Sequence, residues 1–382
     1  MEKSRIDIVM LVATLLLVGL GSVMIYSASF VVAEEMFNGE SSFFLKRHVV
    51  RVALGISLLA VFAHIDYRKI RKYSLPILGL GVIALCLLFV PGLGLTIRGA
   101  TRTLKIVFLN IQPAEYMKIA LVLFLANWLD KHQDVIQKFV PGLLPGLIIV
   151  TVPFMLIALQ PDYGTAIALG ITAATMLFIG RAKMSHLLAV AMTAIPFISV
   201  KLYLSDHSRQ RIVTYFDRLA GEGQAVVQGS DYQLYQSLIS LGTGGFFGTG
   251  LGQSRQKFLF LPDPHTDFVF AVIGEEMGFL GTIAVLGLFI ILAWRGIRVA
   301  QQAPDGYGFF LAAGLTTLIS LHVILNIGVV TGLLPTTGLP LPFVSYGGSW
   351  LLFCMMAVGI MLNISRSSTR RRRMQYEVNG SY

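Results

Sequence analysis

Long apolar runs dominate this sequence and decide what it can fold into. A barrel that crosses a membrane would show alternating segments of about 10 residues, whereas an α-helix needs about 20 apolar residues to cross a bilayer. Only 13% of the residues are charged, against about 25% in soluble domains. The sequence therefore predicts an all-α polytopic membrane protein with ten transmembrane helices. The expected spans lie near 8–30, 48–65, 73–91, 114–129, 139–158, 164–181, 185–204, 267–294, 308–332 and 343–364.

One membrane domain accounts for nearly the whole chain. Ten spans of about 20 residues use about 200 positions and leave only loops and tails. We expect residues 1–366 to form this domain, and residues 367–382 to form a basic cytoplasmic tail that contains Arg370 to Arg373. The first apolar stretch is longer than the core of a signal peptide, about 7–15 residues, so we expect it to remain as the first helix.

The distribution of Lys and Arg sets the expected orientation. With a cytoplasmic amino terminus, the segments on that side hold 17 basic residues and those on the other side hold 10. Half of the ten lie in the long segment 205–266, where the positive-inside rule is weaker. We therefore expect both termini in the cytoplasm and a large extracytoplasmic loop, 205–266, between helices 7 and 8.

Two connections on the predicted outer side carry unusual residues. The stretch 242–252 is rich in glycine, which either serves turns between interfacial helices or lets the backbone approach a ligand closely. The connection 91–112 carries Arg98, Arg102 and Lys105 on the side where basic residues are disfavoured. These cations either reach lipid headgroups or bind an anionic group such as a diphosphate.

Charged and polar residues inside or beside apolar spans are costly and therefore indicate function. Glu115 and Lys118 are three residues apart and can pair on one helical face, as a structural ion pair or as part of a site. His322 and Asn326 are four apart and are expected to make interhelical polar contacts. Asp267 is expected to open the eighth helix, as a capping acid or as a reactive carboxylate.

Small residues follow Asp267 at helical spacing. In a helix, Ala271, Gly274 and Gly278 share its face, where they either permit close packing or leave space beneath the carboxylate. His265, two residues earlier, is a neighbouring acid–base candidate. Residues alone leave the role of Asp267 open.

Seven short motifs occur in a fixed order along the chain. They are Gln-Pro-Ala-Glu with Lys118 (112–118), Gln-Pro-Asp-Tyr-Gly-Thr (160–165), Tyr-Gln-Leu-Tyr-Gln-Ser (232–237), Gly-Leu-Gly-Gln-Ser-Arg-Gln-Lys (250–257), Leu-Pro-Asp-Pro-His-Thr-Asp-Phe-Val-Phe-Ala (261–271), Gly-Glu-Glu-Met-Gly-Phe-Leu-Gly (274–281) and Gly-Leu-Pro-Leu-Pro-Phe-Val-Ser-Tyr-Gly-Gly-Ser (338–349). Together they resemble the shape, elongation, division and sporulation (SEDS) family, from the first span to Arg366. Ile-Gly-Glu-Glu (273–276) and Trp-Arg-Gly-Ile-Arg (294–298) look closer to the FtsW and SpoVE branch than to RodA.

The resemblance implies a peptidoglycan glycosyltransferase that polymerises lipid II into glycan strands during septal wall synthesis, in division or sporulation. Asp267 matches the family's essential carboxylate, with the implied role of general base toward a sugar hydroxyl. The diphosphate leaving group needs positive charge rather than a general acid. That charge comes from Arg and Lys or from a divalent cation (Mg or Mn), and no organic cofactor is expected.

Substrate-binding candidates come from residues that match the family motifs and from nearby cations. Arg102 is the first of them, because it matches the basic member of the family's Gly-Ala-x-Arg-Trp motif. The others are Gln112, Glu115, Lys118, Gln160, Asp162, Gln233, Ser237, Ser254, Arg255, Lys257, His265, Thr266, Ser345, Tyr346 and Ser349.

The chain departs from the family pattern in two places. Thr103 stands where that motif has Trp, which leaves the substrate contacts of this loop open. Residues 221–228 replace a common acidic Asp-Pro-Phe stretch, and Asp231 takes the place of a frequent glycine. The conformation of the long loop is therefore less constrained by the resemblance than the assignment of Asp267.

The resemblance also implies a location and partners. The location is the bacterial cytoplasmic (inner) membrane, with the active site on its outer face. The partners are lipid II, the growing glycan strand, membrane lipids, a class B penicillin-binding protein and other divisome proteins, with no nucleic acid. Two alternatives remain, a lipid II flippase and a non-catalytic scaffold for the transpeptidase. A flippase is less favoured because no internal repeat is visible and Asp267 lies near a helix end.

Overall fold

Helices make up most of this chain. The computed structural model describes residues 6–37, 39–97, 100–106, 109–204, 206–220, 230–254, 256 and 264–379. The long helices are α1 (Ile8–Met36), α2 (Phe43–His64), α4 (Ser74–Leu87), α5 (Pro113–Lys131), α6 (Leu144–Leu159), α7 (Tyr163–Ile179), α8 (Met184–Leu204), α11 (Val269–Gln301), α12 (Gly306–Val330) and α13 (Trp350–Asn379). Shorter elements are α3 (Tyr67–Arg71), the π-helical turn η1 (Phe139–Leu143), α9 (Asp206–Leu219) and α10 (Ser230–Thr243).

The apolar runs coincide with helices, with one difference at the last of them. Within the described residues, five helical segments are long and apolar enough to cross a membrane: 8–36, 139–159, 269–301, 306–330 and 350–368. The last span was expected from residue 343, but α13 begins at Trp350. Pro340, Pro342 and the Gly347–Gly348 pair precede it and disfavour helix, so this segment forms a loop.

A small antiparallel sheet corrects the expectation of an all-α fold. Its strands are β1 (Gly94–Ile97), β2 (Ala100–Ile106) and β3 (Leu109–Ile111), in the order β1-β2-β3. Residues with branched β-carbons are frequent in 94–111, and they favour extended backbone. The sheet was missed because the run is short and lies between two strongly apolar helices.

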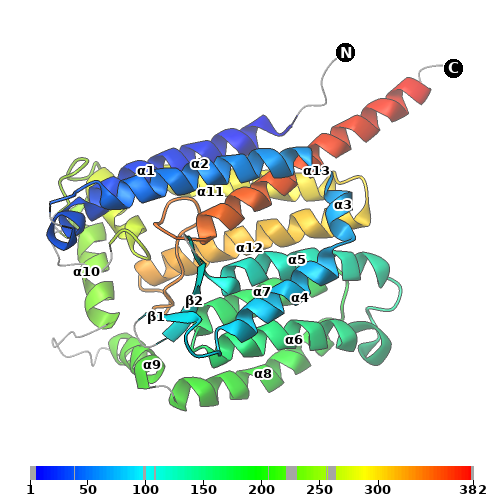
Figure 1. Ribbon diagram of the computed structural model, residues 1–382, viewed down its shortest axis with the longest axis horizontal. Coiled ribbons are helices and arrows are strands. Elements are labelled where there is room, and N and C mark those ends of the chain that lie inside the picture. The colour runs from blue at the N-terminus through cyan, green and yellow to red at the C-terminus, as the bar shows by residue number, and fades with distance from the viewer. Residues whose placement is uncertain are drawn as a thin grey trace.

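The helices run side by side as a bundle (Figure 1). α1 and α2 lie along one side, α4, α6 and α8 along the other, and α5, α7 and α12 between them. α1 begins and α13 ends at one end of the bundle. The opposite end holds α9, α10 and the sheet. We call it the Asp267 end, because α11 begins there, two residues after Asp267.

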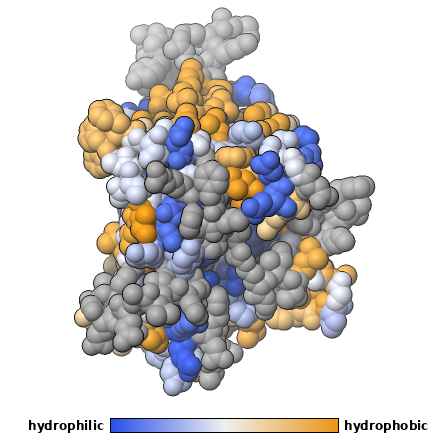
Figure 2. Space-filling model, turned by 90° about the vertical axis from the view of Figure 1, so that its left-hand side faces the viewer, coloured by the Kyte–Doolittle hydropathy of each residue, from blue (hydrophilic) through white to orange (hydrophobic). Residues whose placement is uncertain are grey.

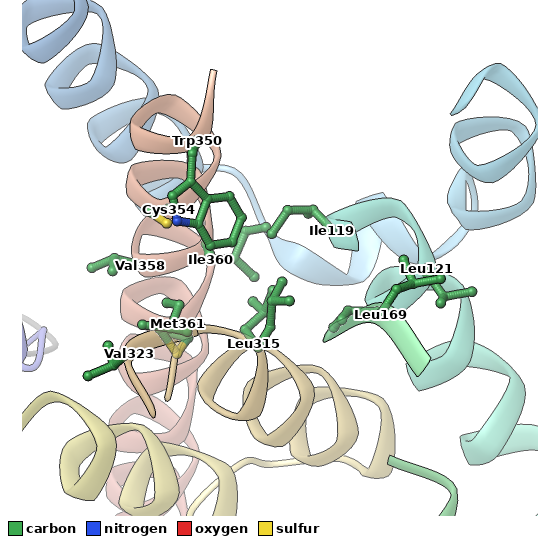
Figure 3. Close-up of a cluster of buried hydrophobic side chains, with 14 of the residues drawn as sticks. Ile119, Leu121, Leu169, Leu315, Val323, Trp350, Cys354, Val358, Ile360 and Met361 are labelled. Carbon is green, nitrogen blue, oxygen red and sulfur yellow. The ribbon is translucent and has the colours of Figure 1, made fainter. Parts of the chain in front are cut away.

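The apolar core of the bundle lies between the central helices α5, α12 and α13. Apolar side chains such as Ile119, Leu315 and Val358 fill the space between them (Figure 3). α13 also packs closely on α2, where a Cβ on Gly359 would lie 2.6 Å from the carbonyl oxygen of Leu59. Small residues at such crossings let helix backbones approach in a membrane.

The glycine-rich stretch 242–252 packs against a break in α11. Gly278 has φ 65° and ψ −162°, which interrupts the helix. Across this break, Thr249 donates its amide to the carbonyl of Glu275, at 2.9 Å, and Phe279 donates to the carbonyl of Gly245, at 2.9 Å. Gly244 and Gly248 therefore serve close packing against the backbone of α11, and Gly274 and Gly278 lie on the other side of this contact.

A substitution at Gly248 tests this packing. It has φ +82°, and a Cβ there would lie 2.2 Å from the carbonyl oxygen of Glu276. We expect Gly248→Ala to lower the free energy of unfolding by about 2–5 kcal/mol, because backbone strain adds to overpacking. Gly252→Ala is the control: φ is +77° with open space around the site, so the loss should be only about 1–2 kcal/mol. Thermal unfolding in detergent measures both, and equal losses would contradict the packing role.

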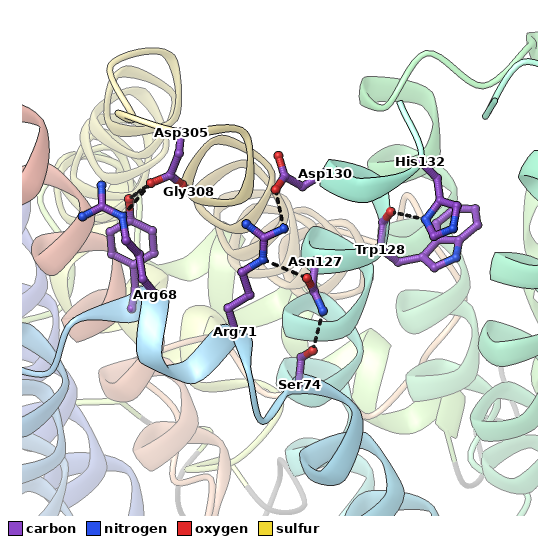
Figure 4. A network of polar contacts seen from close by, with 10 residues as sticks. Arg68, Arg71, Ser74, Asn127, Trp128, Asp130, His132, Asp305 and Gly308 are labelled. Carbon is purple, nitrogen blue, oxygen red and sulfur yellow. Dashed lines mark hydrogen bonds and ion pairs between the residues drawn. The ribbon is translucent and has the colours of Figure 1, made fainter. Parts of the chain in front are cut away.

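Polar contacts hold the other end of the bundle together (Figure 4). Arg71 pairs with Asp130 at 2.7 Å and donates to Asn127 at 2.9 Å. Tyr67 donates its hydroxyl to Asp305 at 2.6 Å. Burial raises the pKa of the Tyr67 hydroxyl, and its hydrogen bond to Asp305 raises this pKa further, so the phenol stays a donor. These contacts join α3, α5 and the start of α12.

Candidate active site

Asp267 lies in a turn at the Asp267 end. The turn covers 264–268, and α11 begins two residues after Asp267, with Phe268 at its N-cap. The expectation that Asp267 opens the helix as a capping or first-turn acid is therefore wrong: the carboxylate is carried by the connection before the helix. Asp267 is half-buried, and a Cβ on Gly338 would lie 3.4 Å from its Oδ2.

Asn326 ties this turn to the loop before α13. Its side-chain amide donates to the carbonyl of Asp267 at 2.7 Å and to the carbonyl of Leu339 at 2.8 Å. A second hydrogen bond joins the same two segments: the backbone amide of Tyr346 donates to the carbonyl of His265 at 2.8 Å. Two segments about 70 residues apart are thus held against one another beside the carboxylate. The polar contact predicted for Asn326 is present, but it joins α12 to the backbone of two connecting segments rather than to another helix.

A buried ionic network lies one helical turn from Asn326. The ammonium of Lys118 is 2.6 Å from the Glu115 carboxylate and 2.7 Å from Nε2 of His322. It also lies 3.8 Å from the centre of the Trp350 ring, a cation–π contact. The pairing of Glu115 with Lys118 is confirmed, and His322 adds the interhelical contact predicted for it.

Arg102 belongs to a second polar group. Its guanidinium donates to the carbonyl of Pro161 and lies 3.8 Å from the carboxylate of Asp162. Gln112 donates its side-chain amide to Asp162 at 3.5 Å and its backbone amide to Ser349 at 3.1 Å. β2, the α6–α7 turn and the loop before α13 therefore meet here.

The remaining candidates divide into three groups. Thr266, like His265, lies in the turn that holds Asp267, and Gln233 is half-buried in α10. Others make bonds within the protein: Gln160 donates to the carbonyl of Leu85, Ser237 to the carbonyl of Val330, Ser254 to Glu275, and Ser345 accepts from the amide of Leu341. Arg255 and Lys257, like the loop 221–228, lie outside the described residues.

The face at the Asp267 end is polar toward its middle (Figure 2). Hydrophilic residues gather there, and hydrophobic ones lie toward the edges. The carboxylate of Asp267 can take a proton from a bound alcohol, and the cations at this end can hold an anion. The geometry therefore favours a site for a substrate that carries both groups.

Comparison with known proteins decides the family. The model of the FtsW/RodA/SpoVE cell cycle proteins matches residues 8–370. The chain belongs to this family. Stage V sporulation protein E of Bacillus subtilis is 40% identical over 367 residues, which cover 96% of this chain and 99% of that protein. The protein named probable peptidoglycan glycosyltransferase FtsW of Geobacter sulfurreducens is 40% identical over 364 residues, covering 95% and 96%.

Solved structures carry the same fold. One, described as structural coordination of polymerization and crosslinking by a peptidoglycan synthase complex, matches with a TM-score of 0.76 and 26% identity, over 95% of this chain and 98% of that chain. The rod shape determining protein RodA of Thermus thermophilus matches with a TM-score of 0.69 and 26% identity, over the same shares. Family membership and fold are thus established together, and the division and sporulation relatives share more sequence with this chain than the solved RodA does.

Some contacts near the site could not be read from the sequence. Nothing local marks the bonds from Asn326 to the carbonyls of Asp267 and Leu339, because the partners lie far apart in the chain. Arg51 and His48 of α2 also reach this region, through Tyr346. One signal could have drawn attention to Arg51, a charged residue within an apolar span.

Proposed function

We propose that this protein is a peptidoglycan glycosyltransferase that polymerises lipid II into glycan strands during septal wall synthesis, in division or sporulation. The observation that carries the proposal is the half-buried Asp267, whose backbone carbonyl accepts from Asn326 at the same end of the bundle as Arg102 and Lys118. Relatives 40% identical over nearly the whole chain bear the name probable peptidoglycan glycosyltransferase FtsW.

The chemistry needs one base and nearby positive charge. Asp267 takes the proton of a sugar 4-hydroxyl as its oxygen attacks the anomeric carbon of the lipid-linked sugar. The new bond joins that oxygen to the anomeric carbon, and the bond to the diphosphate oxygen breaks. The leaving group departs as an anion, so no second carboxylic acid is required, and Arg102 and Lys118 stabilise the developing charge. Arg255 and Lys257 are further candidates for this role.

A divalent cation is the other possible source of charge. Among the described residues, no three His, Cys, Asp or Glu side chains form a cluster that could hold a metal ion. Mg²⁺ would instead bind through one or two carboxylates together with the phosphates of the substrate, and Arg and Lys are the positive charge that the chain itself supplies.

The expected placement in the cell follows from the same proposal. Ten helices cross the cytoplasmic membrane of a bacterium: α1, α2, α4, α5, α6 with η1, α7, α8, α11, α12 and α13. Residues 1–366 form this domain, both termini and the basic tail 367–382 lie in the cytoplasm, and the Asp267 end faces outward. A class B penicillin-binding protein and other divisome proteins are the proposed partners. Support for such a partner comes from the solved relative described as part of a peptidoglycan synthase complex.

Polymerisation of lipid II tests the proposal directly. Purified protein is mixed with lipid II, alone and with its transpeptidase partner, and glycan polymer is resolved on a gel. Polymer in either arm supports the proposal. If labelled lipid II moves across the liposome membrane and no glycan polymer forms, the result supports a flippase instead. An absence of both, with partner binding retained, supports a scaffold.

Asn326 should position the reaction without taking part in it. We expect Asn326→Leu to lower kcat by about 100-fold with little change in KM, because a shift of about 1 Å at a reacting group costs about this much. Polymerisation rates over a range of lipid II concentrations measure it. A variant with the kcat of the parent protein would contradict the role.

Asn363 provides a matched control at the other end of the bundle. Its amide also makes two bonds to backbone, accepting from Tyr67 at 3.1 Å and donating to Ala63 at 3.0 Å. Asn363→Leu should lower the melting temperature about as much as Asn326→Leu does, and it should leave the kcat of folded protein unchanged. Equal losses of kcat in both variants would indicate a general loss of structure.

A further inference from the structure

One face of α2 converges on Tyr346. Phe44, His48 and Arg51 follow one another at spacings of four and three residues, so they form a single stripe. The ring of Tyr346 lies 5.3 Å from that of Phe44 and 6.4 Å from that of His48, and the Arg51 guanidinium carbon is 4.6 Å from its centre. The stripe continues at Gly55, which packs on α13, so α2 is held in this position.

This stripe adjoins the turn that carries Asp267. The amide of Tyr346 donates to the carbonyl of His265, and the His265 ring lies 4.6 Å from Phe44 and 5.5 Å from Tyr346. Asp267 follows two residues later. Arg51 and His48 therefore lie one layer of aromatic side chains from the candidate base.

Two polar groups in the stripe lack partners within the described part of the chain. His48 is only 1% exposed, and its Nε2 makes no hydrogen bond there. Nη1 of Arg51 is also buried without an acceptor, and no described carboxylate pairs with this guanidinium. Arg102 and Lys118, in contrast, have Asp162 and Glu115 as counter-ions.

Such unsatisfied groups require an explanation. A buried donor without a partner costs about 1–3 kcal/mol, and more when it is charged. The cation–π contact with Tyr346 offsets part of this cost but satisfies no N–H group. Arg51 is the ninth residue of α2, about 12 Å from its start at 1.5 Å per residue, within reach of lipid headgroups at the helix end.

We propose that Arg51 and His48 bind a phosphate-type anion of a lipid head group beside Asp267. A guanidinium can donate two parallel hydrogen bonds to phosphate oxygens, while Tyr346 supports its other face. The neutral imidazole of His48 can donate a third from Nε2. This proposal rests on the proposed function, since the diphosphate of a lipid-linked sugar brings such an anion to the carboxylate.

The test measures binding by the full chain in nanodiscs. The probes are inorganic diphosphate, lipid II and, in a separate arm, phosphatidylglycerol as competitor. We expect Arg51→Gln to weaken binding of diphosphate and lipid II by about 10–100-fold, because a charged hydrogen-bonding group is lost. Arg51→Lys should be intermediate, since it keeps the charge and loses the planar fork. His48→Phe should weaken binding less than Arg51→Gln.

A matched control separates binding from packing. Arg298 also rests on an aromatic ring, 4.1 Å from the centre of Trp294, in the last turn of α11 and therefore far from the start of this helix. Arg298→Gln should leave diphosphate binding unchanged. Arg51→Gln should not lower the melting temperature without ligand, because it removes a buried charge that has no counter-ion in the described residues.

Each outcome decides. If excess phosphatidylglycerol displaces diphosphate from the parent protein, the anion that binds at this site comes from bulk lipid. If it does not, the anion is that of the substrate. Both results support an anion site at Arg51 and His48. Equal diphosphate binding by the parent and Arg51→Gln overturns it, as does a lower melting temperature with unchanged binding. Failure of the proposed function looks different: the parent makes no glycan polymer, yet binds diphosphate in an Arg51-dependent manner.

Discussion

Replacing Asp267 with Asn should reduce polymerisation of lipid II by about 100- to 10,000-fold, the usual contribution of a general base. The substitution keeps the size of the side chain and removes its capacity to take a proton. Because Asn326 binds the backbone carbonyl of Asp267, the turn should keep its conformation in the variant. Binding of lipid II should therefore change much less than the rate of polymer formation, which is followed by gel.

Two further variants sharpen this result. Asp267→Glu keeps the carboxylate but moves it by one methylene against Gly338, so it should recover only part of the activity. Asp134→Asn is the matched control, because it removes an exposed carboxylate at the other end of the bundle. Its rate should equal that of the parent protein. Full activity in Asp267→Asn would exclude the general-base role and favour the scaffold.

Local spacing explains which contacts were predictable from the sequence. Glu115 and Lys118 lie three residues apart in a helix, so their pairing follows from helical geometry alone. The apolar runs likewise indicate helices, because they have the length that a bilayer demands. Their ends are less certain where proline and glycine gather, as at the segment before Trp350.

Long-range contacts could not be predicted in this way. Asn326 meets the carbonyl of Asp267 across 59 positions, and Arg51 meets Tyr346 across 295 positions. A single sequence records which residues are polar but not which distant segment each one faces. The glycine-rich stretch shows the same limit, because its composition suits a ligand site as well as the close packing against Gly278 that the fold contains.

Replacing Lys118 with Met should be among the most destabilising changes in the protein. Lys118 is fully buried and Glu115 nearly so, and the substitution leaves the carboxylate without its counter-ion. Removing one partner of a buried pair costs about 3–5 kcal/mol, because the remaining charge stays out of water. We expect a clear drop in melting temperature and in the yield of folded protein.

The double variant Glu115→Gln, Lys118→Met decides between the two roles left open for this pair. It removes both charges at nearly constant volume, so most of the stability lost in Lys118→Met should return. If polymerisation returns with it, the pair is structural. If the double variant folds but stays inactive, Lys118 contributes charge to the reaction, as the mechanism requires. A single Lys118→Met variant as stable as the parent would contradict the ionic coupling, because this substitution also removes the contacts of the ammonium with His322 and Trp350.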